Sequence, residues 1–366
     1  MTKPAIVHMI AAARPNFMKV APLWHALTEA PDFHPVLIHT GQHYDPNMSD
    51  AIFADLRLPA PDHHLGVGSG SHAEQTGNVM IAYEKIAVAE RPEWLIVVGD
   101  VNSTAACAMV AAKLHLPCVH LEAGLRSGDR AMPEEINRLV TDAIANVLWT
   151  PSPDGDANLI REGVDQARIS RVGNIMLDSF EMVRPAIEMA NVPGELGLTA
   201  GRYAVVTLHR PSNVDEDAPL TQLVDALIAV QAKLPLVWPV HPRAAKRLAQ
   251  TGLAAKLESV GVQLIEPVPY IRFMSLVLNA AAAITDSGGI QEETTYLGIP
   301  CLTLRENTER PITISEGTNQ LTRADRLAAD TETALARPKS TLPRPQFWDG
   351  ATAARCVEDL RARTSR

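Results

Sequence analysis

Cysteine and aromatic side chains are scarce in this chain of 366 residues. The four cysteines are far apart and form no Cys-x-x-Cys pair, which argues against a cysteine-ligated zinc site. Three of them lie in apolar segments, and we interpret them as reduced thiols in the core of a cytosolic protein. The aromatic fraction of 4% leaves few side chains on which nucleic-acid bases could stack. The cysteines are Cys107, Cys118, Cys301 and Cys356.

Positive charge is also in deficit. The formal net charge of −9 at pH 7 argues against a nucleic-acid-binding surface. The sequence contains no apolar run of membrane-spanning length. The apolar residues 5–13 are interrupted by His8, and Lys3 is the single basic residue before them. A buried first strand of a parallel sheet therefore explains them better than a signal segment. We therefore expect neither a nucleic acid nor a membrane as partner.

Apolar residues, by contrast, are plentiful. They make up 46% of the sequence, and 366 residues exceed one ordinary domain, so two α/β domains are expected. Strand-like and helix-like segments alternate through both halves, as in βαβ units with parallel strands. Residues 191–201 combine a proline with several glycines and indicate a linker. We predict an N-terminal domain over residues 1–190 and a C-terminal domain over residues 191–366, with the last helix able to pack back on the first domain.

Polar side chains gather where the predicted strands end. Any one of them could simply cap the following helix. In parallel α/β sheets, however, ligands bind outside the carboxyl ends of the strands. Together these residues therefore indicate two domains that line a shared cleft. The residues are Arg14, Gln42, His43, Asp100, Glu122, His209, His241 and Asp286.

One turn, in the sequence TDSGGIQEETTYLG at residues 285–298, is unusually rich in glycine. A strand runs into Ser287 and Gly288, and a helix then continues to Gly298, which is typical of a helix stop. Unpaired amides at a helix N-terminus attract phosphate, and glycine lets the backbone approach closely. A serine-capped helix, with Glu292 and Glu293 favouring the helix dipole, is the alternative. This stretch alone leaves both interpretations open.

Seven segments between residues 6 and 319 resemble, in order, the non-hydrolysing UDP-N-acetylglucosamine 2-epimerases. They read ARPNFMKVAP, HTGQHYD, VVGDVNST, HLEAGLRSGDRAMPEEINR, TLHRPSNVD, TDSGGIQEETTYLGIPCLTLRENTERP and EGTN. The resemblance implies an α/β fold with two Rossmann-like domains facing across a cleft, in the glycosyltransferase-B arrangement. It also implies a cytoplasmic homodimer that interconverts UDP-N-acetylglucosamine and UDP-N-acetylmannosamine for polysaccharide biosynthesis.

The chemistry of this reaction explains which residue types are needed. The proton on carbon 2 is weakly acidic because that carbon carries no carbonyl, so the family is thought to eliminate UDP and add it back. This route requires acid/base groups and stabilisation of the departing diphosphate, and we expect no metal and no nicotinamide cofactor. The resemblance assigns the acid/base roles to Asp100, Glu122, Glu134 and His209.

The resemblance also implies a set of residues that hold UDP. Arg14 and Lys19 would meet the phosphates together with the turn at Ser287 and Gly288. Glu293 would hold the ribose hydroxyls, and the backbone of Phe273 would meet uracil. Further cleft candidates are Gln42, His43, Arg210 and His241. The chain departs from the family pattern at Asn16 and at Pro211-Ser212, and both departures bear on the choice of sugar.

Alternative functions remain open at this point. A relative acting on a modified UDP sugar, such as a UDP-2,3-diacetamido-uronic acid, has a similar motif set. A sugar-nucleotide-binding protein without activity would not need four acid/base residues, and a glycosyltransferase would not need the motif from Glu122 to Arg138. His120-Leu121-Glu122 has the H-x-E pattern of zinc deaminases, but no P-C-x-x-C follows.

Overall fold

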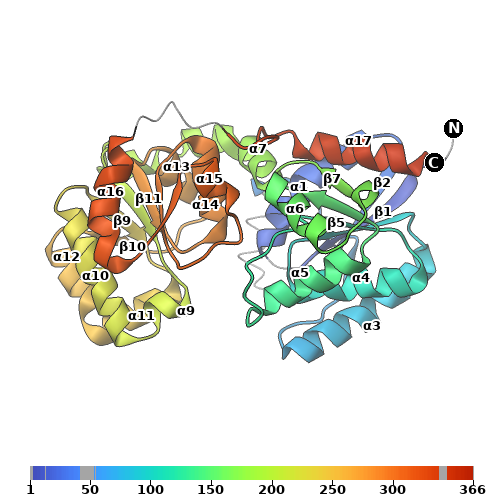
Figure 1. The fold of residues 1–366 in the computed structure, drawn as a ribbon, viewed down its shortest axis with the longest axis horizontal. Coiled ribbons are helices and arrows are strands. Elements are labelled where there is room, and N and C mark those ends of the chain that lie inside the picture. Colours follow the sequence, from blue (N-terminus) through green and yellow to red (C-terminus); the bar gives the residue numbers. More distant parts are fainter. Residues whose placement is uncertain (1–2, 13, 42–52, 54, 338–343, 366) are drawn as a thin grey trace. The chain divides into compact units, whose positions relative to one another are not determined.

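The computed structural model describes residues 3–12, 14–41, 53, 55–337 and 344–365. The chain folds as two compact units, drawn in Figure 1. The first unit comprises Met1–Met182 and Gln346–Arg366, and the second comprises Val183–Pro345. The division falls within helix α7 (Ile175–Met189), and the C-terminal segment returns to the first unit.

The first unit is built on a parallel sheet. Among the described residues it has seven strands in the order β3-β2-β1-β4-β5-β6-β7. The order reverses beside β1, so β1 and β4 flank the switch point at which such sheets open a crevice. The strands are β1 (Ala5–Ala11), β2 (Phe33–His39), β3 (His63–His64), β4 (Trp94–Val98), β5 (Cys118–Leu121), β6 (Val147–Thr150) and β7 (Ile169–Arg171).

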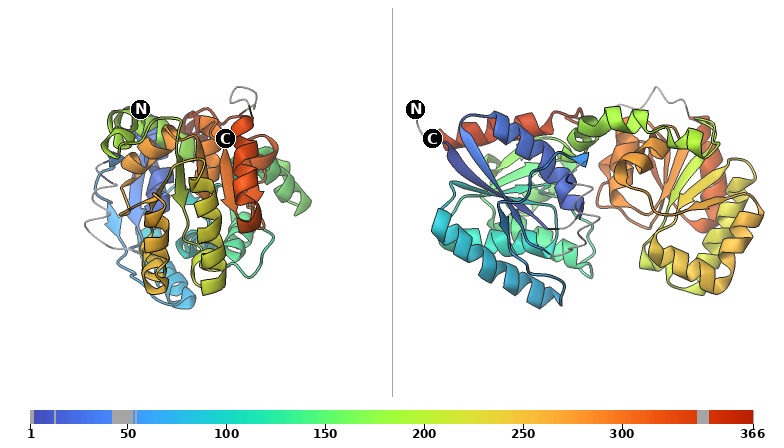
Figure 2. Two further views of the ribbon diagram at one scale, coloured as in Figure 1. Left: turned by 90° about the vertical axis from the view of Figure 1, so that its left-hand side faces the viewer. Right: turned by 180° about the vertical axis from the view of Figure 1, so that it is seen from behind.

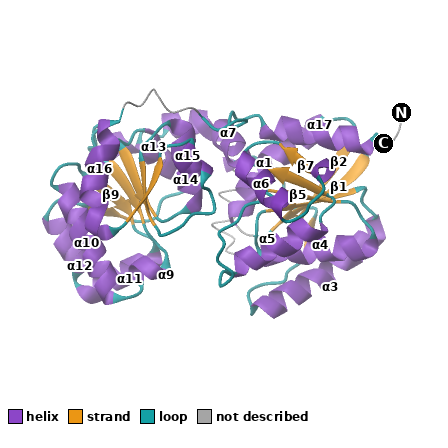
Figure 3. Ribbon diagram, viewed as in Figure 1, coloured by secondary structure: helices purple, strands orange, loops and turns teal. Residues whose placement is uncertain are grey.

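Helices cover both faces of this sheet (Figure 3). The central strand β4 has the sequence WLIVV and is buried throughout, as expected for a parallel strand enclosed on both sides. The C-terminal helix α17 packs along α1, as the right-hand view in Figure 2 also shows. The helices are α1 (Arg14–Glu29), α3 (His72–Glu90), α4 (Asn102–Leu114), α5 (Pro133–Ile144), α6 (Pro153–Arg161) and α17 (Thr352–Thr364).

The second unit repeats this architecture. Its described residues form six parallel strands in the order β10-β9-β8-β11-β12-β13, with the switch point between β8 and β11. Residue 204 of β8 pairs with residue 282 of β11, so both strands end at the same edge of the sheet. The strands are β8 (Ala204–Thr207), β9 (Leu236–Pro239), β10 (Gln263–Ile265), β11 (Ala282–Thr285), β12 (Cys301–Leu304) and β13 (Asn319–Thr322).

The helices of the second unit differ in length. A hydrophobic core on one face of the sheet joins Trp238 of β9 to apolar residues of α10, α11, α12 and α16. Short helices lie in the connections: α8 (Val192–Glu195), α9 (Pro211–Val214) and α15 (Ile312–Ser315). The longer helices are α10 (Asp217–Gln231), α11 (Pro242–Thr251), α12 (Leu253–Ser259), α13 (Tyr270–Leu278), α14 (Gly288–Leu297) and α16 (Leu327–Ala336).

Two expectations from the sequence can be compared with this fold directly. The predicted linker at residues 191–201 contains α8, whose first residues Val192 and Pro193 are buried, so part of it is packed structure. All four cysteines are free and buried, whereas only three were predicted to lie in the core, and burial raises the pKa of Cys118 to about 12. No helix in the described part of the chain is both long and apolar enough to cross a membrane.

Candidate functional site

The turn after β4 brings the first predicted acid/base residue to the edge of the sheet. Gly99 has a φ of +68°, a left-handed conformation that favours glycine. A Cβ atom at this position would lie 3.4 Å from Lys19 Nζ and 3.5 Å from Glu122 Oε2. The turn therefore sits against the second predicted carboxylate, and Asp100 follows it with its side chain 34% exposed.

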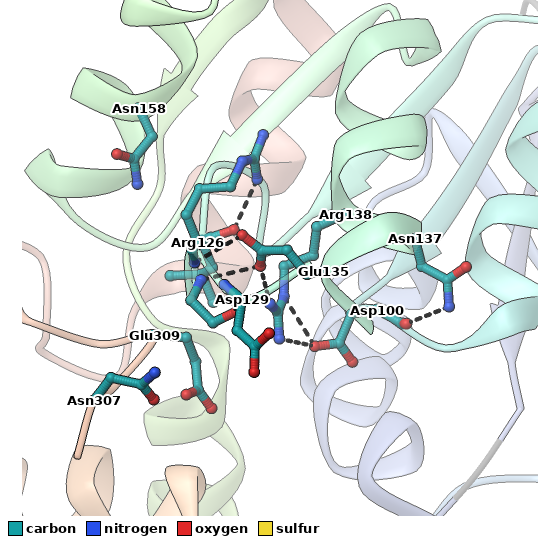
Figure 4. Close-up of polar contacts among 12 residues, drawn as sticks. Asp100, Arg126, Asp129, Glu135, Asn137, Arg138, Asn158, Asn307 and Glu309 are labelled. Atoms are coloured by element: carbon teal, nitrogen blue, oxygen red, sulfur yellow. Dashed lines mark hydrogen bonds and ion pairs between the residues drawn. The ribbon is translucent and has the colours of Figure 1, made fainter. Parts of the chain in front are cut away.

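Asp100 is held by an arginine from α5. The Nη2 and Nε atoms of Arg138 donate to Asp100 Oδ2 at 2.7 and 3.1 Å, and Figure 4 shows the two side chains facing each other. Arg138 Nη1 also donates to Glu135 Oε2 at 2.5 Å. Asn137 donates to the backbone oxygen of Asp100 at 2.9 Å. The carboxylate of Asp100 is thus oriented by a buried cation while part of it stays accessible.

Glu135 has a different role from the one its position suggests. The sequence places it in the first turn of α5, where it would only favour the helix dipole. In the structure it is buried and accepts hydrogen bonds from the amides of Ser127 and Gly128, each at 3.0 Å. Burial alone would raise the pKa of Glu135, but these amides and Arg138 lower it below its usual value. Glu135 therefore anchors the 127–128 loop next to Arg138.

Glu122, directly after β5, is the second predicted acid/base residue. Its side chain is 4% exposed and forms an ion pair with Lys19 of α1. Its backbone has a φ of +73°, which is unfavourable for a residue with a side chain, and such strained residues cluster at functional sites. The structure thus brings Glu122 and Lys19 together beside the Gly99 turn, although Lys19 was predicted to serve the phosphates.

The other predicted residues of the first unit are Glu134, Arg14, Gln42 and His43. Glu134 is exposed in the first turn of α5, with Pro133 as the first helical residue. Arg14 begins α1, but its side chain lies outside what the structure describes. Gln42 and His43 also lie outside the described residues. Asn16, one of the departures from the family pattern, is buried and donates its amide to Val98 O at 3.1 Å, a bond that an ionised carboxylate could not donate.

In the second unit, Asp286 organises the turn after β8. Its buried carboxylate accepts hydrogen bonds from the amides of His209 and Arg210 and from the side chain of Asn213. His209 Nδ1 lies 2.9 Å from Asp286 Oδ1, while the His209 side chain is 44% exposed. Burial would raise the pKa of Asp286, but His209 and Asn213 lower it. The predicted acid/base histidine therefore has one ring nitrogen fixed and a large part of its ring accessible.

The glycine-rich turn begins α14 as predicted. Ser287 is the N-cap residue, but its side chain makes no capping hydrogen bond, so the serine-capped alternative is not what the structure forms. A Cβ at Gly288 would lie 2.8 Å from Glu309 Oε1 and 3.1 Å from Arg310 Nη1, whereas a Cβ at Gly289 would meet nothing within 4 Å. Gly288 thus lets the helix terminus approach a charged pair that a side chain would displace.

The two glutamates of α14 are both buried, in different surroundings. Glu293 accepts a hydrogen bond from Tyr270 Oη at 2.6 Å. Burial raises the pKa of Glu293 to about 7; the Tyr270 bond opposes this rise and the charge of Glu292 adds to it. Glu292 is 1% exposed and pairs with Arg310 Nε at 2.7 Å. The expectation that Glu292 is only a helix-end charge is therefore wrong, because it is part of a buried ion pair.

The remaining predicted residues of the second unit are Phe273, His241 and Arg210. Phe273 is half-buried in the first turn of α13, and its amide donates to Pro269 O at 2.9 Å. His241 lies 5.7 Å from His209 between ring centroids, and burial together with His209 lowers its pKa. Arg210 lines a hollow of about 390 Å³ at the ends of β8, β12 and β13. No sequence pattern points to Tyr270, because it meets Glu293 only once the fold brings the two residues together.

These features define an α/β protein of two Rossmann-like units, a class that binds ligands outside the carboxyl ends of its parallel strands. The charged residues of both units lie at those ends. Residues 25–361 match the family model of UDP-N-acetylglucosamine 2-epimerase, and the chain belongs to this family of isomerases.

Individual relatives agree with this assignment. The chain is 42% identical over 321 residues to a UDP-N-acetylglucosamine 2-epimerase of Methanocaldococcus jannaschii, covering 86% of this chain and 87% of the relative. It is 37% identical over 359 residues to the UDP-2,3-diacetamido-2,3-dideoxy-D-glucuronate 2-epimerase of Pseudomonas aeruginosa, covering 97% and 98%. The crystal structure of the M. jannaschii UDP-GlcNAc 2-epimerase in complex with UDP-GlcNAc and UDP matches with a TM-score of 0.86 at 38% identity, over 98% of this chain and 99% of that chain. The predicted family and the two Rossmann-like domains are confirmed.

Proposed function

We propose that the protein interconverts UDP-N-acetylglucosamine and UDP-N-acetylmannosamine by inverting carbon 2. The observation that carries this proposal is the family match over residues 25–361 in a chain that keeps Asp100 and Glu122 at adjacent strand ends. The solved relative that holds UDP-GlcNAc and UDP, at 38% identity, supports the same substrate.

The reaction that fits these residues is an elimination followed by an addition. A base removes the proton from carbon 2, the C–H electrons form a double bond to carbon 1, and the C–O bond breaks so that its electron pair leaves with UDP. UDP then adds back to carbon 1 while a proton is delivered to the opposite face of carbon 2. Each acid or base in position would contribute on the order of 10²–10⁴-fold.

In this proposal each unit supplies one part of the chemistry. Asp100, Glu122 and Glu134 are the acid/base candidates of the first unit, and His209 is that of the second. Lys19, which pairs with Glu122, would supply a cation for the phosphates. Arg14 would add a second cation for the phosphates.

The nucleotide is assigned to the second unit. The α14 terminus at Ser287 and Gly288 would bind the diphosphate through its amides. Glu293 would accept hydrogen bonds from the ribose hydroxyls, and the backbone of Phe273 would meet uracil. Gln42, His43, Arg210 and His241 remain further cleft candidates.

A UDP-2,3-diacetamido-uronate is the second candidate substrate. The 37% identity to the P. aeruginosa enzyme over 97% of the chain supports it. The departure from the family pattern at Asn16 bears on the same choice of sugar. Both candidates share the nucleotide and the inversion at carbon 2, so the choice depends only on groups elsewhere on the sugar.

The assembly and cellular role extend this proposal. The family resemblance supports a cytoplasmic homodimer that supplies an N-acetylmannosamine nucleotide for polysaccharide synthesis. Light scattering during size-exclusion chromatography tests the dimer, and a monomer at micromolar concentration would contradict it.

A panel of UDP sugars incubated with the protein in deuterium oxide tests the function itself. NMR then follows the configuration and the isotope at carbon 2. We expect the epimer of one candidate substrate, with deuterium at carbon 2 and a trace of free UDP. Epimer that keeps the original hydrogen would refute the elimination route, and no reaction with any UDP sugar would refute the function.

A further inference from the structure

A histidine and an aspartate are buried beneath the turns that carry the predicted carboxylates. His120 lies in β5 and Asp142 in α5, with side chains 0% and 1% exposed. His120 Nδ1 lies 2.6 Å from Asp142 Oδ1. Burying two ionisable groups is unfavourable unless their hydrogen-bonding capacity is satisfied, so their other partners indicate what the pair does.

The histidine holds the turn that leads to Asp100. His120 Nε2 lies 2.8 Å from the backbone oxygen of Gly99. Gly99 is the left-handed residue between β4 and Asp100, and its amide donates to Leu121 O at 3.0 Å. The peptide group immediately before Asp100 is therefore fixed through its carbonyl by His120.

The aspartate holds the turn that follows Glu122. Asp142 Oδ2 accepts a hydrogen bond from the Gly124 amide at 3.0 Å. Gly124 has a φ of +81°, and a Cβ there would lie 2.4 Å from Gly155 O, so this turn has a single tightly packed conformation. The backbone of Glu122 is thus fixed by β5 before it and by Asp142 after it.

Hydrogen-bond roles in this pair are determined by the partners. The Gly99 carbonyl can only accept, so His120 Nε2 carries a proton. Asp142 also pairs with Arg126 Nη1 at 2.7 Å. Asp142 Oδ2 faces two donors, Arg126 and the Gly124 amide, so this group is a carboxylate whose Oδ1 accepts from Nδ1. His120 and Arg126 also lower the pKa of Asp142 against the effect of its burial. Both ring nitrogens of His120 therefore donate.

We propose that His120 and Asp142 are positioning residues that tie the Asp100 turn to the Glu122 turn, with His120 donating from both ring nitrogens. The pair touches no substrate and sets the spacing of the two carboxylates through Gly99 and Gly124. This inference deepens the proposed function and rests on the acid/base roles assigned there. Since the diphosphate turn, Glu293 and Phe273 all belong to the second unit, disturbing the pair lowers the turnover number and changes the affinity for UDP little.

The protonation of the ring is tested on the unaltered protein. Uniform ¹⁵N labelling of the histidines gives ring-nitrogen shifts and one-bond N–H couplings near neutral pH, and His120 is assigned by the signal lost in a His120→Gln variant. We expect two protonated ring nitrogens in a ring that does not exchange rapidly with water. One unprotonated nitrogen would overturn the proposal, and this result does not depend on any activity.

The positioning role is tested with a matched pair of substitutions. In His120→Gln the side-chain amide can take the place of Nε2 and keep the bond to Gly99, whereas in His120→Asn it takes the place of Nδ1 and keeps only the bond to Asp142. A displacement of about 1 Å in a catalytic group costs about 100-fold in rate. We therefore expect His120→Asn to lower kcat by about that factor, and His120→Gln to lower it less.

The control is UDP affinity, which both variants should keep. Full activity in a folded His120→Asn protein, or a greater loss in His120→Gln than in His120→Asn, would overturn the positioning role. A variant that fails to fold leaves the ring-nitrogen measurement on the unaltered protein to decide. An unaltered protein that converts no UDP sugar would instead refute the proposed function, and the protonation of His120 would still be measured.

Discussion

Replacing Glu293 by glutamine should make the second unit more stable, and the gain should depend on pH. Burial raises the pKa of Glu293 from 4.5 in the unfolded chain to about 7 in the folded one. Between these values the folded state holds a proton that the unfolded state releases, so stability falls as pH rises through this window. A shift of this size corresponds to about 3 kcal/mol, since each pKa unit is worth about 1.4 kcal/mol.

Glu293→Gln removes the ionisation and keeps an acceptor for Tyr270. We expect the variant to exceed the unaltered protein in unfolding free energy by up to about 3 kcal/mol at about pH 8, and to match it at about pH 4.5. Guanidinium unfolding at both pH values measures the difference, in which the other titrating groups cancel. A difference that is the same at both pH values would refute the reasoning.

Glu292→Gln is the matched control on the same helix. It removes one of the two carboxylates that pair with the buried Arg310 and leaves the other, Glu309, so it should destabilise the protein at both pH values. In Glu293→Gln, by contrast, UDP affinity should fall while stability rises. If Glu293 holds the ribose, the variant should bind UDP about 10-fold more weakly, since a hydrogen bond to a charged group is worth about 1.5–3 kcal/mol.

Three further outcomes are expected. Gly288→Ala should lower UDP affinity and stability, because its methyl group would lie against Glu309. Gly289→Ala faces open space and should change neither quantity by more than about 1 kcal/mol. Isothermal titration with UDP and thermal unfolding compare the two variants. Asp100→Asn and Glu122→Gln should each lower kcat by about 10²–10⁴-fold and change UDP affinity little; a parallel loss of both would place these residues in nucleotide binding. The four buried cysteines should resist a thiol reagent until denaturant is added, and rapid labelling of the native protein would contradict their burial.

Local sequence patterns were sufficient to predict the elements that carry the site. The glycine-rich turn was predicted to open a helix that stops at Gly298, and α14 begins at Gly288 and ends before a left-handed Gly298. Pro133 is the first residue of α5, a position that suits its fixed φ. These predictions succeeded because glycine and proline restrict the backbone locally, without help from tertiary contacts.

The partners of the charged residues could not be predicted in this way. Glu135 and Glu292 both occupy first-turn or early helix positions, where exposed carboxylates favour the helix dipole. Each is instead buried against an arginine, Arg138 in one case and Arg310 in the other. Glu292 precedes β12 in the sequence and Arg310 follows it, so no local pattern joins the two residues. The roles assigned to the site residues in catalysis and UDP binding stay predictions.

The return of the C-terminal segment to the first unit affects the order in which the chain can fold during synthesis. The second unit is one continuous stretch, Val183–Pro345, and can fold as soon as it leaves the ribosome. The first unit begins earlier but is completed later, because the indole nitrogen of its buried Trp149 donates to Asp359 of α17 at 2.7 Å. A nascent chain that stops before α17 leaves this donor without its acceptor. The first unit, although synthesised first, can therefore complete its fold only after the last residues have left the ribosome.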